Sequence, residues 1–168
     1  MGPEPIEVEF RDEHLEPLRR FLGGDIGGLE PFDANPDNPD VEAARLLMLT
    51  AAMIGIQKRF GNPFYRREII RFVADLRISH GKNAEILDPR VLEELILVAL
   101  GTVHPNDIHH STNDPDVAVT AQMLILGKLR DENVIPPEEV DEFTQEVMAF
   151  ARQMLEVQRA LVAGTFSL

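Results

Sequence analysis

The chain has 168 residues and a mass of 18.9 kDa, which fits one domain of ordinary size with room for a buried core. Asp and Glu outnumber Lys and Arg by 29 to 16, and the formal net charge is -13. This negative charge argues against a protein that binds DNA or anionic lipid over its whole surface, because binding to phosphate groups requires a positive electrostatic potential. The absence of cysteine excludes disulfide bonds, thiolate zinc sites and a cysteine nucleophile.

The sequence carries no targeting or membrane signal that we can identify. Its first residues lack the basic and apolar regions of a secretory signal. The longest apolar stretch lies within residues 46–56 and is too short for a membrane span, which needs about 20 residues. We therefore expect a cytoplasmic protein with no membrane partner.

Residues 1–39 form an acidic segment that is rich in loops. Ile6, Val8 and Phe10 alternate with glutamates, which is the pattern of a short extended strand, and a strand needs a partner strand. Residues 12–22 have the apolar spacing of a short helix. Glycines and prolines in residues 23–39 predict a loop.

Residues 40–168 have helical periodicity almost throughout and predict an all-α fold, a compact bundle of five or six helices. Helices are expected over about 40–60, 64–79, 88–100, 115–131 and 137–164. Asp88 is the expected N-cap of the third, with Pro89 at its first helical position. The helices that begin near residues 40 and 115 are apolar almost all round, and we expect them at the centre of the core.

These two central helices also begin alike. Residues 39–41 and 115–117 share the sequence Pro-Asp-Val, and an amphipathic helix follows each central helix. One interpretation is a duplicated helical hairpin, with half-repeats 40–79 and 115–163 linked by helix 88–100. The other is that helical hairpins share a period and similar caps, so that such matches arise by chance.

The last helix has a heptad pattern. Its apolar residues recur at alternating spacings of three and four residues: Val140, Phe143, Val147, Phe150, Met154, Val157 and Leu161. This stripe is either an internal core face or a seam shared with a second copy or a partner protein. For the seam we single out Phe143, Val147, Phe150 and Met154.

Charge is unevenly distributed along the chain. Residues 57–77 carry a net charge of +4, whereas residues 131–146 hold seven acids and no base. Arg66, Arg67 and Arg71 are candidates for binding acidic groups of a partner, because a guanidinium binds carboxylates and phosphates in a bidentate manner. The alternative is that they neutralise acidic loops of the same chain. We do not expect nucleic acid, since one tyrosine and no tryptophan are present for base stacking.

Three of the five histidines lie in a polar loop after helix 88–100. Imidazole and carboxylate groups suit zinc, nickel, manganese or iron(II), and the candidate metal ligands are His104, Asp107, His109, His110 and Asp114. Their spacing matches no established metal motif, and loop histidines are more often only solvated. Acidic residues on the helices, at 93–94 and 138–146, are a second candidate for a divalent metal.

The sequence therefore favours a non-catalytic, acidic helical module for protein–protein interaction that self-associates as a homodimer or other homo-oligomer, without a cofactor. The alternative is a metal-dependent hydrolase that uses the histidine-rich loop 104–114 or the helix carboxylates. No grouping of Ser, His and Asp around a nucleophile elbow is visible in the sequence.

Overall fold

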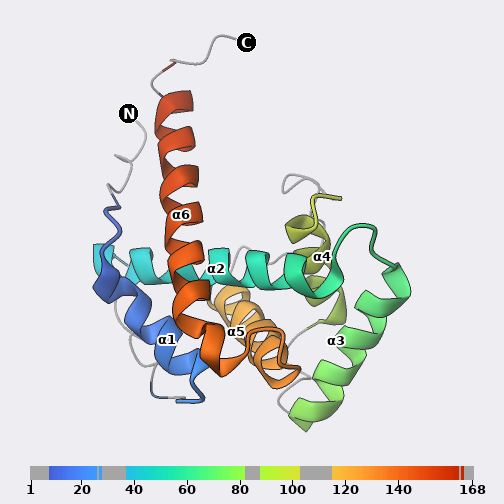
Figure 1. The fold of residues 1–168 in the computed structure, drawn as a ribbon. Coiled ribbons are helices and arrows are strands. Elements are labelled where there is room, and N and C mark those ends of the chain that lie inside the picture. Colours follow the sequence, from blue (N-terminus) through green and yellow to red (C-terminus); the bar gives the residue numbers. More distant parts are fainter. Residues whose placement is uncertain are drawn as a thin grey trace. The chain divides into compact units, whose positions relative to one another are not determined.

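A computed structural model of the chain describes residues 8–25, 27, 37–81, 88–102, 115–162 and 164. Over these residues the fold is all-α, with six α-helices, two short 3₁₀ helices and no strand, which confirms the predicted fold class. Figure 1 shows the elements: η1 (Asp12–Leu15), α1 (Glu16–Leu22), α2 (Pro39–Phe60), α3 (Arg66–His80), α4 (Pro89–Ala99), α5 (Pro115–Asp131), η5 (Pro137–Glu139) and α6 (Val140–Val162).

Helix starts lie where the local signals predict them. Helices α2, α4 and α5 each begin at a proline. Proline fits the first helical position because an N–H at that position would have no acceptor within the helix. The Asp88 side chain accepts a hydrogen bond of 2.9 Å from the backbone N–H of Arg90, as expected of the N-cap of α4. At α2 the cap is Asn38, whose side-chain oxygen accepts from the N–H of Asp40 at 3.0 Å.

The chain divides into two compact units. One consists of residues 1–50 and 137–168, and the other of residues 51–136, so α2 contributes to both. The division into segments 1–39 and 40–168, and the half-repeats within the second, stay predictions.

In the first unit α1 packs against α6. The expected short helix over residues 12–22 is present as η1 and α1, and its apolar residues Leu15, Leu18 and Leu22 are buried. Burial of an apolar stripe on a helix this short supplies most of its stability, because an isolated helix of this length is marginal in water.

The expected strand near the N-terminus is not formed in the described residues. Val8 and Phe10 are buried and Glu9 is exposed, so the predicted alternation of burial is present. The carbonyl oxygens of Val8 and Phe10 accept hydrogen bonds from Arg159 (3.2 Å) and Arg152 (3.3 Å) of α6. Arginine side chains thus satisfy backbone groups that a strand would pair with another strand. Ile6 lies outside the described residues.

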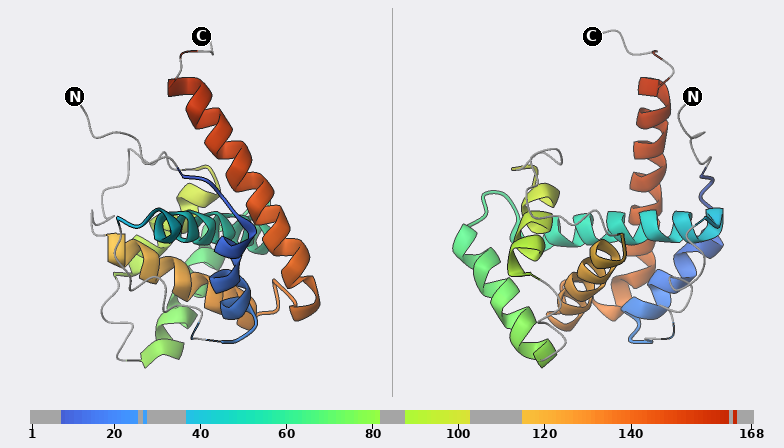
Figure 2. Two further views of the ribbon diagram at one scale, coloured as in Figure 1. Left: turned by 90° about the vertical axis from the view of Figure 1, so that its left-hand side faces the viewer. Right: turned by 180° about the vertical axis from the view of Figure 1, so that it is seen from behind.

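In the second unit α3 packs against α4 and α5 (Figure 2). Its core contains Ile56, Ile69, Phe72, Leu76, Leu92, Ile96, Ile125 and Leu129, all at most 2% exposed. The rings of Phe60 and Phe72 meet edge to face, with centroids 5.4 Å apart. The side chain of Gln57 also donates to the carbonyl oxygen of Ala99 at the end of α4, at 3.0 Å.

The two helices expected at the centre are buried as predicted. No residue of α2 from 41 to 56, and no residue of α5 from 121 to 130, is exposed. A helix that is apolar on most of its sides is stable only when most of its surface is buried. The sequence of such a helix therefore indicates a position in the core. None of the described helices is both long enough and apolar enough to span a membrane.

Candidate functional site

The heptad stripe of α6 is covered along its first half and uncovered along its second. Phe143 and Val147 are buried in the first unit, and Phe150 is half-buried. Beyond them the stripe continues into solvent with Met154 (52% exposed), Val157 (42%) and Leu161 (62%). We call these three residues the open seam. Of the four residues that we predicted for the seam (Phe143, Val147, Phe150 and Met154), only Met154 is exposed.

The described residues before η1 contact a different side of α6 from the open seam. Arg152 and Arg159, which bind the carbonyl oxygens of Phe10 and Val8, are seven residues apart and therefore share one face of α6. With 3.6 residues per turn, this face is opposite Met154, Val157 and Leu161. Residues 8–11 run beside the C-terminal half of α6 (Figures 1 and 2). The positions of Arg152 and Arg159 on the helix place this segment on the side away from the seam.

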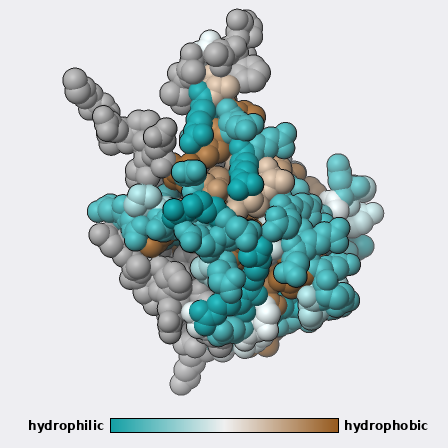
Figure 3. All heavy atoms as spheres, turned by 60° about the vertical axis from the view of Figure 1, so that its left-hand side comes forward, coloured by the Kyte–Doolittle hydropathy of each residue, from teal (hydrophilic) through white to brown (hydrophobic). Residues whose placement is uncertain are grey.

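The flanks of the open seam carry no charge. The positions beside it on the helix surface are Gln153, Gln158 and Ala160. Figure 3 shows hydrophobic side chains among the hydrophilic ones along the C-terminal half of α6. In a protein with a net charge of -13, an apolar strip without flanking acids is a surface that can meet another acidic protein without local charge repulsion.

The predicted arginine cluster lies on the exposed side of α3, in the second unit. Arg66, Arg67 and Arg71 are all exposed, and Arg67 and Arg71 line a shallow hollow together with Glu68. The guanidinium of Arg67 lies 5.5 Å from the ring centroid of Tyr65. Over the described residues none of the three arginines makes an ion pair.

The predicted histidine-rich metal site lies outside the described residues. This applies to all five candidate ligands, namely His104, Asp107, His109, His110 and Asp114. The helix carboxylates are placed in different units, with Glu93 and Glu94 on α4 and the acids of residues 138–146 on η5 and α6. In the parts of the chain that the structure describes, none of them joins a group of three possible metal ligands.

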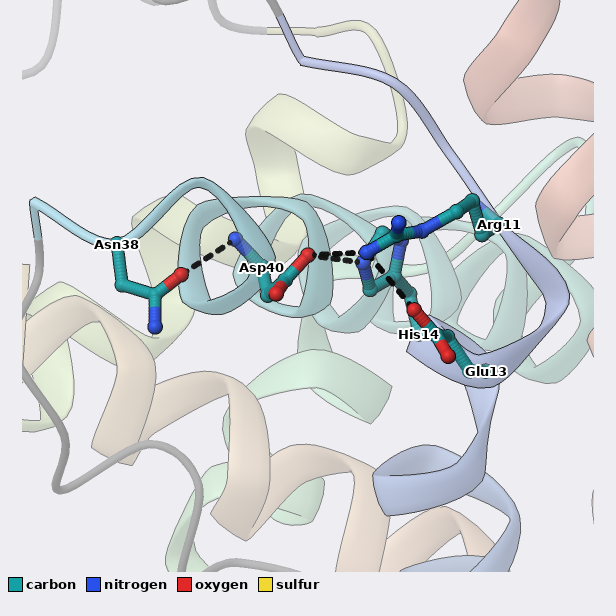
Figure 4. Close-up of polar contacts among 5 residues, drawn as sticks. All are labelled: Arg11, Glu13, His14, Asn38 and Asp40. Atoms are coloured by element: carbon teal, nitrogen blue, oxygen red, sulfur yellow. Dashed lines mark hydrogen bonds and ion pairs between the residues drawn. The ribbon is translucent and has the colours of Figure 1, made fainter.

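One group of possible metal ligands that we did not predict lies in the first unit: Glu13, His14 and Asp40. Figure 4 shows how it is built. The buried ring of His14 accepts the backbone N–H of Arg11 at Nδ1 (3.0 Å), so its proton lies on Nε2 and is donated to Asp40 Oδ1 (2.9 Å). Arg11 Nη2 lies 2.7 Å from Asp40 Oδ1 and 2.8 Å from Glu13 Oε1.

This arrangement acts as a polar clamp rather than a metal centre. Both ring nitrogens of His14 are already engaged, and the guanidinium of Arg11 bridges the two carboxylates where a cation would otherwise bind. The hydrogen bond from His14, and then the charge of Arg11, lower the pKa of Asp40 below its ordinary value of 3.8. The clamp holds η1 to the first turn of α2. Asp40 is 26 positions from His14 in sequence, so no local pattern could have indicated the pair.

Comparisons with protein-family models, with curated protein sequences and with solved structures find no match to this chain.

Proposed function

We propose that this protein is a non-catalytic interaction module that self-associates through the open seam of α6. The observation that carries the proposal is the continuation of one heptad stripe from the buried half of the helix to the exposed half, at Met154, Val157 and Leu161. An exposed apolar strip of this regularity is typical of a helix–helix contact, whereas scattered exposed apolar residues are common on any surface.

A second copy is the occupant that fits the seam best. The same heptad on another molecule presents the same spacing, and a twofold contact places each stripe against its own copy. The flanks of the seam are uncharged at Gln153 and Gln158, so two copies can pair there without repulsion between like charges. A partner helix chosen for its charge would need a charged flank to recognise, and these flanks offer none.

The size of the seam predicts weak association. Fully burying one such side chain contributes roughly 1.5–3 kcal/mol, so covering the exposed half of three side chains on each of two copies contributes about 6 kcal/mol. Even before the cost of association, that free energy corresponds to a dissociation constant of about 40 µM. Because the cost of association raises this constant further, we expect a weak dimer that is populated only well above about 40 µM.

Sedimentation equilibrium from 10 to about 500 µM tests this proposal. The wild-type chain should dimerise as concentration rises, and Met154→Glu should remain monomeric. Ala149→Glu is the matched control, because it adds the same charge to an exposed position of α6 away from the stripe. Added salt should strengthen the dimer by screening repulsion between two acidic chains. A wild-type protein that is monomeric over the whole range refutes the proposal.

A further inference from the structure

Helix α3 presents a second stripe on the side opposite its core face. The core face consists of Ile69, Phe72, Val73 and Leu76, each at most 2% exposed. On the other side, spacings of three and four residues bring together Arg67, Ile70, Arg71, Ala74 and Ile78, all of them exposed. We call these five residues the outer face of α3. Ile70 is 49% exposed and Ile78 is 78% exposed.

Local helix stability does not explain this outer face. Isoleucine is a weaker helix former than the lysine, glutamate or alanine that usually fill exposed helix positions. Arginines in the first turn, as at Arg66 and Arg67, are opposed by the positive end of the helix dipole. The exposed side chains of Ile70 and Ile78 therefore suit contact with another molecule better than contact with water.

The chemistry of the outer face points to a protein rather than a nucleic acid. Among the described residues, the aromatic ring that lies against Arg67 is that of Tyr65, which is 56% exposed. Aliphatic side chains at Ile70 and Ile78 match the apolar residues of a peptide and offer no platform for stacked bases.

We propose that the outer face of α3 is a docking surface for an acidic amphipathic helix of a partner protein. Arg67 and Arg71 are one turn apart, so they match two carboxylates that are also one turn apart on the partner. The apolar stripe of the partner lies on Ile70 and Ile78, and the small side chain of Ala74 between them permits close approach of the two helices. A second copy docked through the same face would set arginines against arginines, which disfavours it.

The test uses the full-length, isotope-labelled chain and a synthetic helical peptide that has glutamate pairs four residues apart beside a leucine stripe. A peptide of the same composition in scrambled order is the negative probe. In NMR titrations we expect saturable shifts in residues 67–78 with the helical peptide only. Arg71→Glu should weaken binding about tenfold, because it replaces an attraction with a repulsion. Arg90→Glu, at an exposed position of α4, is the matched control and should bind as the wild type does.

Three outcomes would overturn the proposal. One is equal binding by the Arg71→Glu and Arg90→Glu variants. Another is tighter, Arg71-dependent binding of a single-stranded RNA than of the peptide, which would assign the surface to nucleic acid. The third is a loss of more than about 5 °C in Tm for Arg71→Glu without any ligand. This loss would show that Arg71 makes stabilising contacts within its own chain. Met154→Glu should leave peptide binding unchanged, so the test is independent of the seam on α6.

Discussion

Gly55 provides the sharpest test of how the second unit is packed. It is a buried residue of α2, and its missing side chain admits Leu129 of α5. A Cβ atom added at Gly55 would lie 2.8 Å from Leu129 Cδ1 and 3.8 Å from Ile135 Cδ1. The first distance is shorter than a tolerable contact. Leu129 is 0% exposed, so its side chain has no open solvent into which it can move.

Two effects of Gly55→Ala oppose each other. Alanine in place of glycine stabilises a helix interior by about 1 kcal/mol. Crowding an extra carbon into a packed core costs about 1–3 kcal/mol. The clash falls on the end of a leucine side chain rather than on backbone, so we take the middle of that range. The free energy of unfolding should then fall by about 1 kcal/mol.

A double-mutant cycle separates the two effects. Leu129→Ala alone should cost about 2–5 kcal/mol through the cavity that it leaves. In that background the clash is gone, so Gly55→Ala should become stabilising by about 1 kcal/mol. Urea unfolding of the four proteins measures the coupling, which we expect at about 2 kcal/mol. If Gly55→Ala has the same effect with and without Leu129, the two residues are not in contact and the packing described for this unit is wrong.

Two further predictions concern the polar contacts at helix starts. Because the pKa of Asp40 is lowered by His14 and Arg11, its carboxylate stabilises the folded state above its ordinary pKa of 3.8, and this contribution is lost as the pH falls below that value. Asp40→Asn should therefore lower Tm at pH 7. In thermal unfolding followed by circular dichroism, the difference in Tm from wild type should shrink as the pH falls below the ordinary pKa of 3.8, and a constant difference would contradict the clamp. Asp88→Ala should reduce the free energy of unfolding by about 1 kcal/mol in urea, because the hydrogen bond to the N–H of Arg90 is lost, whereas Asp88→Ser should recover most of it.

The sequence was sufficient for the features that depend on neighbours in the chain. Helices α2, α4 and α5 begin at the prolines that mark them, since capping and the fixed backbone angle of proline act within one turn. The burial of α2 could be predicted because a helix that is apolar on most sides is stable only when it is covered. The arginine cluster on α3 could be found from charge alone, and its three residues are exposed; its role in binding a partner stays a prediction.

Tertiary structure alone decided which parts of an apolar pattern are covered. The heptad of α6 is uniform in sequence, yet Val147 is buried and Leu161 is exposed, because the described neighbouring elements cover this stripe only along the first half of the helix. The alternation at Val8 and Phe10 predicts a strand. Instead, the carbonyl oxygens of these two residues accept hydrogen bonds from arginine side chains of α6. The pair of His14 and Asp40 joins residues that are distant along the chain. Periodicity and caps are local, whereas contacts of this kind depend on which elements the whole fold brings together.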